Sequence, residues 1–93
     1  MISTNEYFDG NVKSLGYTSQ DGTSTIGVME KGDYEFGTSS HETMTVIEGK
    51  LEVKLAGQDE WISYGAGQSF EVEANSSFQV KTASQVSYLC KYA

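Results

Sequence analysis

The stretch ETMTVIEGKLEVKL, residues 42–55, decides the fold class. Apolar side chains occupy alternate positions on both sides of Glu48-Gly49-Lys50, a group of residues that is typical of a turn. Successive side chains of a β-strand point to opposite faces of the sheet, so this period of two predicts two half-buried strands separated by a turn.

Similar alternation continues from Val12 to Tyr92, and no segment of the chain keeps a helical period. Turn-forming groups separate the alternating runs; they are Asp21-Gly22, Lys31-Gly32-Asp33, Ala56-Gly57, Gly65-Ala66-Gly67 and Ala74-Asn75-Ser76-Ser77. About nine short strands at this spacing predict a closed barrel or a jelly roll, because both arrangements protect the edges of the sheets. We therefore expect an all-β protein in which residues 1–93 form a single domain.

The composition of the chain limits its partners and its location. Thirteen acidic residues, six lysines and no arginine give a formal net charge of -7, a field that repels nucleic acids. No apolar run approaches the length of a membrane span, so we expect no membrane partner. The single cysteine, Cys90, excludes an internal disulfide and fits a reducing compartment, and the start of the chain does not resemble a signal peptide. We expect a cytoplasmic protein.

The spacing of residues 36–49 resembles in outline the first motif of the cupin superfamily, a group of small jelly-roll proteins. That motif has two histidines one residue apart, a glutamate four or five residues later, and a glycine seven residues after the glutamate. Glu42 and Gly49 have the last spacing, whereas Phe36 and Thr38 occupy the two histidine positions. If the gap between histidine and glutamate is one residue longer, the two histidine positions fall on Glu35 and Gly37, which carry no imidazole either.

The second cupin motif begins at Gly67, and its proline and histidine positions are taken by Glu73 and Phe78. A catalytic metal needs about three nitrogen or oxygen ligands from the protein and one open position. Of the superfamily's ligand positions only Glu42 keeps a ligand side chain. The sequence therefore predicts a pocket without a metal, with Phe36 and Phe78 pointing inward.

The only histidine, His41, lies next to Glu42 in a loop-like segment, and neighbouring side chains of a strand point to opposite faces. We expect His41 to be exposed to solvent and to have no role in the reaction. Cys90 is expected to be a small buried hydrophobic residue, because the spacing gives no reason for a contact between it and His41.

A carboxylate surrounded by apolar side chains is the candidate site. If Glu42 faces inward, Met44 and Val46 follow it on the same face of the strand. The residues expected on neighbouring inner faces are Tyr34, Phe36, Thr38 and Phe78. Two alternatives remain open: the apolar side chains only fill the barrel, and Glu42 lies at a strand end in water.

Five segments occur in order along nearly the whole chain: NEYFDGNVKSLGY, TIGVMEKGDYEFGT, ETMTVIEG, EWISYGAGQSFEVEANSSFQV and SYLCKY. Together they resemble the pyrimidine/purine nucleoside phosphorylase family, whose members are small single-domain cupins. The chain departs from that family at Glu73, where a proline is expected, and at Thr43, where a second acidic residue is common.

The resemblance implies reversible cleavage of nucleosides by inorganic phosphate, which gives ribose 1-phosphate and a free base. It implies both purine and pyrimidine substrates: adenosine, guanosine, inosine, xanthosine, uridine, cytidine and thymidine. It implies no metal and no organic cofactor.

Phosphorolysis passes through a state that resembles a ribosyl cation, and Glu42 is the candidate to stabilise it. The expected substrate-binding residues are Tyr34, Phe36, Thr38, Met44, Phe78 and Tyr88. Phosphate has to be held by backbone amides, hydroxyls or a lysine, and the candidates are Lys13 and Ser77, with Thr38, Thr45 and Ser76 also available.

Two other functions remain open at this stage. A cupin without catalytic activity that binds a small sugar or a nucleoside would use the same pocket. A metal-dependent oxygenase or isomerase would recruit His41, Glu42 and Glu35 as ligands. For the oligomeric state we expect a homodimer.

Overall fold

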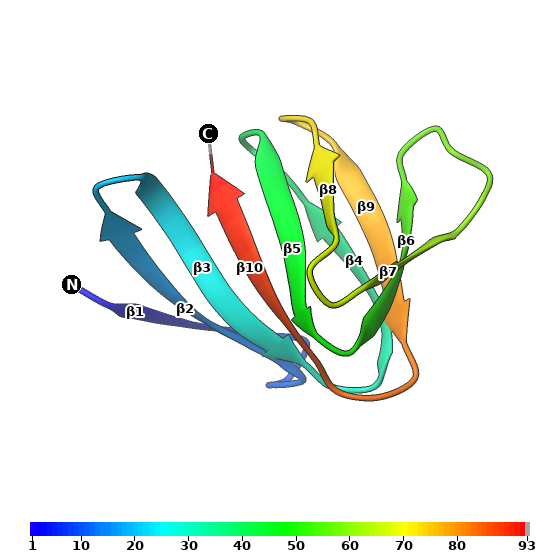
Figure 1. Cartoon of the computed structure of the whole chain (residues 1–93), viewed down its shortest axis with the longest axis horizontal. Helices are drawn as coiled ribbons and strands as arrows, with labels where there is room; N and C mark the ends of the chain where they lie inside the picture. Colours follow the sequence, from blue (N-terminus) through cyan, green and yellow to red (C-terminus); the bar gives the residue numbers. More distant parts are fainter. Residues whose placement is uncertain (93) are drawn as a thin grey trace.

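A computed structural model of the chain describes residues 1–92, which form ten strands in two antiparallel sheets (Figure 1). The strands are β1 (Ser3–Tyr7), β2 (Val12–Ser19), β3 (Gly22–Met29), β4 (Gly32–Gly37), β5 (Glu42–Glu48), β6 (Lys50–Leu55), β7 (Ile62–Gly65), β8 (Ser69–Val72), β9 (Ser77–Thr82) and β10 (Val86–Tyr92). Within the described residues, no helix is long and apolar enough to cross a membrane.

The larger sheet has the order β1-β2-β3-β10-β5-β8, and the smaller sheet has the order β4-β9-β6-β7. The chain passes between the sheets several times, so strands far apart in sequence, such as β3 and β10, are neighbours (Figure 1). The prediction of an all-β jelly roll is confirmed, in the form of two separate sheets and not of one closed ring of hydrogen bonds.

Ten strands form where about nine were predicted, because β1 and β7 carry little alternation. Each of these strands pairs with only one neighbour in the described residues, β1 with β2 and β7 with β6. The side chains of β1 are almost all exposed, so neither face of the strand needs apolar residues. Edge strands of this kind leave a weak signal in sequence patterns.

The core fills the space between the inner faces of the two sheets. Its largest fully buried side chains are Met29, Leu51, Val12, Val46, Val53, Val80 and Val86. Ile26 and Val28 also alternate in the sequence, but they are 43% and 48% exposed on the outer face of β3. Alternation therefore predicted the strand correctly, whereas the inner face of β3 carries Thr25, Gly27 and Met29 instead.

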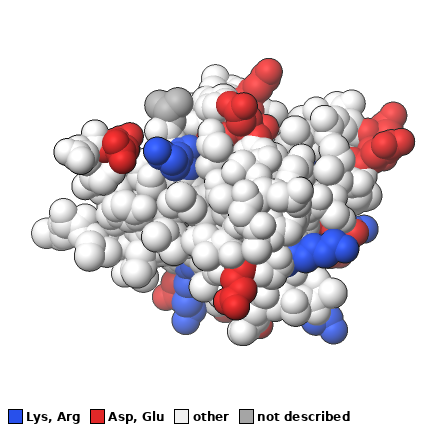
Figure 2. Space-filling view, viewed as in Figure 1, with Lys and Arg blue, Asp and Glu red and all other residues white. Residues whose placement is uncertain are grey.

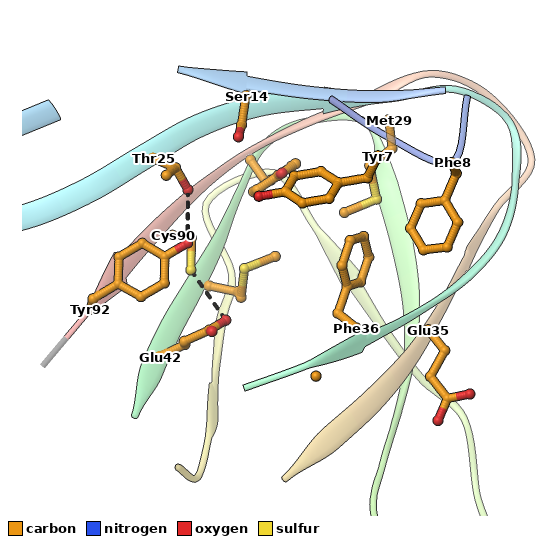
Figure 3. A pocket seen from close by; sticks show the side chains of 13 residues that line it. Tyr7, Phe8, Ser14, Thr25, Met29, Glu35, Phe36, Glu42, Cys90 and Tyr92 are labelled. Atoms are coloured by element: carbon orange, nitrogen blue, oxygen red, sulfur yellow. Dashed lines mark hydrogen bonds between the residues drawn. The ribbon is translucent and has the colours of Figure 1, made fainter. Parts of the chain in front are cut away.

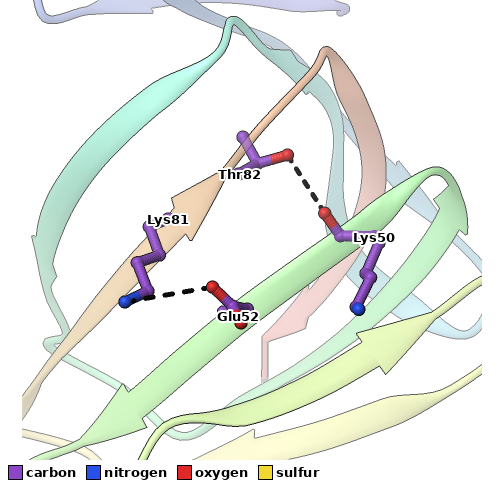
Figure 4. A network of polar contacts seen from close by, with 4 residues as sticks. All are labelled: Lys50, Glu52, Lys81 and Thr82. Atoms are coloured by element: carbon purple, nitrogen blue, oxygen red, sulfur yellow. Dashed lines mark hydrogen bonds and ion pairs between the residues drawn. The ribbon is translucent and has the colours of Figure 1, made fainter.

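Polar contacts join β6 and β9 in the smaller sheet (Figure 4). The hydroxyl of Thr82 donates to the backbone oxygen of Lys50 at 3.0 Å, and the Lys81 ammonium lies 3.9 Å from Glu52. The same ammonium lies 4.2 Å from the ring centroid of Trp61. These contacts stabilise the pairing of β6 with β9 within the smaller sheet.

Charged side chains are unevenly distributed over one face of the molecule. Figure 2 shows that they lie mostly around the periphery of the face in view, and that a broad central area carries none. On this face, therefore, charged side chains surround an uncharged central area.

Candidate active site

A cavity of about 260 Å³ opens between the inner face of the larger sheet, strand β4 and the turn after β1 (Figure 3). Its lining residues are Tyr7, Phe8, Ser14, Thr25, Met29, Glu35, Phe36, Gly37, Glu42, Met44, Tyr88, Cys90 and Tyr92. The volume lies slightly below the range of about 300–1,000 Å³ that is usual for pockets that bind drug-sized ligands, so it suits a small molecule.

Strand register brings these residues together from distant parts of the chain. Tyr88 of β10 pairs with Gly27 of β3, which in turn pairs with Ser14 of β2. A Cβ atom at Gly27 would lie 2.5 Å from both the hydroxyl oxygen and a ring carbon of Tyr88. The absence of a side chain at Gly27 therefore lets the Tyr88 ring lie across β3.

Glu42 begins β5 and turns its half-buried carboxylate into the cavity (Figure 3). Burial raises the pKa of this carboxyl, and a hydrogen bond from Cys90, with 3.4 Å between Sγ and Oε1, lowers it in part. The inward orientation of Glu42 is as predicted, with Met44 and Val46 following on the same face. Glu42 does lie at a strand end, but its side chain is half-buried and faces the cavity.

Cys90 is buried, as expected from the sequence. Burial and the nearby Glu42 carboxylate raise the pKa of its thiol to about 12. The thiol is therefore protonated near neutral pH, which makes it a hydrogen-bond donor and a poor nucleophile. Its contact with Glu42 is a feature that the sequence did not reveal.

Hydroxyl groups gather at one end of the cavity, which we call the hydroxyl end: Ser14, Thr25, Tyr88 and Tyr92. The hydroxyls of Thr25 and Tyr92 lie 3.4 Å apart. The amide of Asn5 donates to the hydroxyl of Ser14, also at 3.4 Å. Burial raises the pKa of Tyr92 to about 12, so its hydroxyl keeps its proton and can donate a hydrogen bond.

Aromatic rings form the other end of the cavity, which we call the aromatic end: Tyr7, Phe8 and Phe36. The centroid of Phe36 lies 5.5 Å from that of Phe8 and 6.4 Å from that of Tyr7, both edge to face. The ring of Phe8 also contacts Tyr34, with 5.0 Å between centroids. Phe8 and Tyr7 are 43% and 45% exposed, so each keeps part of its ring accessible.

Three of the six predicted substrate-binding residues line this cavity, namely Phe36, Met44 and Tyr88. The other three lie outside its lining. Tyr34 is buried beside Phe36, and its hydroxyl donates to the backbone oxygen of Glu30 at 2.8 Å. Phe78 is buried behind Phe36, with the two rings stacked and 5.5 Å between their centroids.

Thr38 is the third predicted residue outside the lining. Its hydroxyl donates to the backbone oxygen of Glu73 at 2.6 Å and accepts from the backbone amide of Ser76 at 2.9 Å. These bonds connect the end of β4 to the loop before β9. Thr38 therefore stabilises that loop, a role that residue type and spacing could not reveal.

The two predicted phosphate-binding residues also lie outside the cavity lining. Lys13 is on the outer face of β2, largely exposed, and its ammonium lies 3.8 Å from the Glu6 carboxylate. The sequence permits an inward Lys13 but favours an ordinary solvent-exposed lysine, and the exposed side chain agrees with the second interpretation; the next residue, Ser14, faces inward. Ser77 lines a separate surface depression beside Lys54 and Gln58.

His41 lies outside the cavity lining, with its side chain 40% exposed and its Nε2 atom 3.0 Å from a Glu71 carboxylate oxygen. In residues 1–92, no three side chains of His, Cys, Asp or Glu are grouped as metal ligands. Phe36 and Phe78 point inward, as predicted, at positions where other cupins place histidines. Hydrocarbon rings cannot ligate a metal, so the donor set does not fit a cupin metal centre.

The sequence did not assign the following lining residues to substrate or phosphate, and it offered Glu35 only as a possible metal ligand: Tyr7, Phe8, Ser14, Thr25, Met29, Glu35, Gly37, Cys90 and Tyr92. The segment that contains Tyr7 and Phe8 was noted only as part of a resemblance. The pairing of β10 with β3 and β5 brings Thr25, Met29, Cys90 and Tyr92 together. Ser14 joins them from β2, and Glu35 and Gly37 from β4 of the other sheet. A single sequence does not show which strands pair.

Comparisons with known proteins agree in their result. The family model described as pyrimidine/purine nucleoside phosphorylase matches residues 2–92. A protein named pyrimidine/purine nucleoside phosphorylase from Pseudomonas aeruginosa (strain LESB58) is 54% identical over 92 residues, which cover 99% of each chain. A protein of the same name from Aeromonas salmonicida (strain A449) is 50% identical over 99% of this chain and 98% of the relative.

Solved structures show the same fold. The crystal structure of a protein of unknown function from Vibrio parahaemolyticus superimposes with a TM-score of 0.97 at 45% identity, covering 100% of this chain and 99% of that one. An RmlC-like cupin from Shewanella frigidimarina has a TM-score of 0.74 at 16% identity, covering 98% and 82% of the two chains. The chain therefore has a cupin fold and belongs to the pyrimidine/purine nucleoside phosphorylase family.

Proposed function

We propose that this protein cleaves nucleosides with inorganic phosphate to give ribose 1-phosphate and a free base. The observation that carries the proposal is the half-buried carboxylate of Glu42, which faces a cavity with aromatic rings at one end and hydroxyls at the other. The names of relatives that match almost the whole chain support the same reaction.

Glu42 stabilises the transition state of this reaction. A phosphate oxygen forms a bond to the anomeric carbon while the bond from that carbon to the base nitrogen breaks, and the electron pair passes to the base. Because the bond to the base breaks ahead of formation of the bond to phosphate, positive charge develops on the sugar, and a nearby carboxylate stabilises it. The departing base takes a proton from water, because the Tyr88 hydroxyl lies at the hydroxyl end of the cavity and burial raises its pKa, so that it keeps its proton.

The substrates are both purine and pyrimidine nucleosides: adenosine, guanosine, inosine, xanthosine, uridine, cytidine and thymidine. Ring and thioether side chains contact the flat face of any base, whereas a selective site needs hydrogen bonds to the base edge. Glu35 is the only charged side chain near the aromatic end among the described lining residues. The reaction is reversible, because the glycosyl bond to the base is exchanged for a glycosyl bond to phosphate and not for one to water.

The reaction uses neither a metal nor an organic cofactor. Support comes from the chemistry of the residues at the superfamily's ligand positions, where Phe36 and Phe78 offer no donor atom. Phosphorolysis also needs none in principle, because the phosphate itself is the nucleophile and Glu42 stabilises the charge.

The protein acts as a homodimer that pairs through the outer face of the larger sheet. Leu15, Ile26 and Leu89 lie side by side there in strand register, and Leu15 and Ile26 are 50% and 43% exposed. The adjacent row runs from Glu6 and Lys13 through Val28 and Ser87 to Glu48, so the proposed pairing rests on the apolar row and not on opposite charges. Light scattering should show a dimer that Leu15→Glu converts to a monomer; a monomeric wild type would disprove the pairing.

The partners of the protein are nucleosides and phosphate, and its location is the cytoplasm. The free thiol of Cys90 fits a reducing compartment, and an excess of acidic side chains disfavours nucleic acids.

Incubation of purified protein with adenosine or uridine, with and without phosphate, tests the proposed reaction. Chromatography should show free base only when phosphate is present, with one ribose 1-phosphate for each base released. Equal release without phosphate would identify a hydrolase instead. Binding of nucleoside without any release of base would identify a non-catalytic binding protein.

A further inference from the structure

The two ends of the cavity differ in chemistry, and Glu42 lies along its wall (Figure 3). Thr25, Cys90 and Tyr92 surround the carboxylate on one side of the view, and Phe8 and Phe36 lie on the other side. A nucleoside has a similar division, because its base is flat and aromatic and its sugar carries hydroxyls.

We propose that the nucleoside lies along the cavity in one orientation, with its base at the aromatic end against Phe8 and with phosphate bound at the hydroxyl end by Ser14, Thr25 and Tyr92. The inference rests on the proposed phosphorolysis and names the groups that bind each substrate. None of these four residues was a candidate on sequence grounds.

In-line displacement requires this arrangement. The attacking phosphate oxygen, the anomeric carbon and the leaving nitrogen lie roughly along one line, so phosphate and base occupy opposite sides of the sugar. With the sugar beside Glu42 and the base at the aromatic end, the phosphate is at the hydroxyl end. The reverse orientation would place the phosphate dianion among aromatic faces, which carry negative partial charge.

The turn after β1 supports the assignment of Phe8. Phe8 and Asp9 have φ values of 53° and 58°, in the left-handed region that non-glycine residues rarely adopt. Two backbone hydrogen bonds, from Gly10 to Tyr7 and from Asn11 to Phe8, hold the turn in this conformation. The turn thus places a 43% exposed ring at the cavity, where a base can stack on it.

Neutral groups hold the phosphate in this arrangement. No lysine or histidine is among the described lining residues, and Glu42 and Glu35 are both acidic. Hydroxyl dipoles aimed at one point can bind an anion without a cation. The hydroxyls of Thr25 and Tyr92 already lie 3.4 Å apart, so both can contact one phosphate group.

The first experiment separates the two substrates by steady-state kinetics. Thr25→Val and Ser14→Ala each remove one hydroxyl, and each should raise the KM for phosphate about tenfold to a hundredfold, with the KM for adenosine changed less than threefold. Thr18→Val is the matched control, because Thr18 is exposed on the same β2–β3 hairpin and should leave both KM values unchanged.

The second experiment tests the other end of the cavity. Phe8→Leu keeps an apolar side chain but removes the ring, and it should raise the KM for adenosine about tenfold while leaving the KM for phosphate unchanged. Trp61→Leu is its control, because that ring contacts Lys81 on the smaller sheet and is not part of the cavity lining.

Calorimetric titrations with adenosine alone and with phosphate alone measure the same preferences without turnover. Weaker phosphate binding in Thr25→Val and weaker adenosine binding in Phe8→Leu would support the orientation. This holds even if the protein releases no base, an outcome that would disprove the proposed phosphorolysis but not the orientation. If Thr25→Val weakens adenosine binding and Phe8→Leu weakens phosphate binding, the orientation is reversed and the inference is wrong. If neither variant weakens either ligand, this cavity is not the binding site and the inference is also wrong.

Discussion

Cys90 donates a hydrogen bond to Glu42 diagonally across two paired strands. In the register of β10 with β5, Cys90 pairs with Met44 and Tyr92 pairs with Glu42, so thiol and carboxylate are two residues apart along the strands. The 3.4 Å contact between Sγ and Oε1 occupies one carboxylate oxygen. The second oxygen is left for the substrate, which fits a carboxylate that stabilises charge on a sugar.

Glu42→Gln should lower kcat by roughly thirtyfold to a thousandfold, because it removes the negative charge that stabilises the transition state. The KM for adenosine should change little, since the base contributes most of the binding. Initial rates at saturating phosphate measure both values, with Glu60→Gln in an exposed loop as the control. Full activity of Glu42→Gln would show that the carboxylate has no part in the reaction.

Cys90→Ala should move the acidic limb of the kcat profile to higher pH. The hydrogen bond from the thiol lowers the pKa of Glu42, so its loss lets that pKa rise further, and the active carboxylate form then appears at higher pH. Cys90→Ser keeps a donor and should restore the wild-type limb. A profile of Cys90→Ala that superimposes on the wild type would contradict this positioning role.

Glu42→Gln should also stabilise the folded protein above the folded-state pKa of Glu42. Burial raises the pKa of this carboxyl above its value in the unfolded chain, so the folded state binds protons more tightly at this group. The contribution of Glu42 to stability is therefore greatest below its unfolded pKa and is lost as the pH rises through the folded pKa. Thermal unfolding at pH 8 should give a higher Tm for Glu42→Gln than for the wild type, and the difference should shrink at pH 4.

Gly27→Ala should lower activity more than the same substitution at a strand glycine whose new Cβ has free space around it. The new Cβ would lie 2.5 Å from the Tyr88 hydroxyl and ring, so the ring has to move out of its position in the cavity wall. We expect a loss of kcat/KM of about tenfold or more, which corresponds to roughly 1.4 kcal/mol. Gly65→Ala in β7 is the matched control, because the nearest atom to its Cβ is 3.8 Å away; equal effects of both changes would rule out this role for Gly27.

His41→Ala should leave kcat/KM within a few-fold of the wild type. The imidazole is 40% exposed, contacts Glu71 and is not part of the cavity lining. A loss of more than about a hundredfold, or roughly 2.7 kcal/mol of transition-state stabilisation, would show that His41 takes part in the reaction.

The sequence predicted the fold more completely than the site. Alternation of Met44, Val46, Leu51 and Val53 reports burial on one face, and each of these residues is buried in the structure. Glu42 could be oriented inward from the same pattern, because it shares the strand face of Met44. These predictions succeed since they depend on positions close together in one strand.

The lining residues that the sequence missed depend on pairing between distant strands. Ser14 and Tyr88 are separated by most of the chain, and both flank Gly27 only because β3 lies between β2 and β10. Lys13 shows a related limit: its residue type made it one candidate for phosphate, but Ser14 and not Lys13 lies on the inner face of β2.

The exposed edge strand β1 contributes little to the hydrophobic core but leads directly into the wall of the cavity. In the part of the chain that the structure describes, residues 3–7 pair only with β2, and nearly all of their side chains are exposed, so they add little to the core. Yet Tyr7 and Phe8, at the end of this strand and in the turn after it, form one wall of the cavity. A chain shortened by its first ten residues would keep its hydrophobic core and lose that wall, so an N-terminal fusion that disturbs β1 would yield a well-folded but weakly active protein.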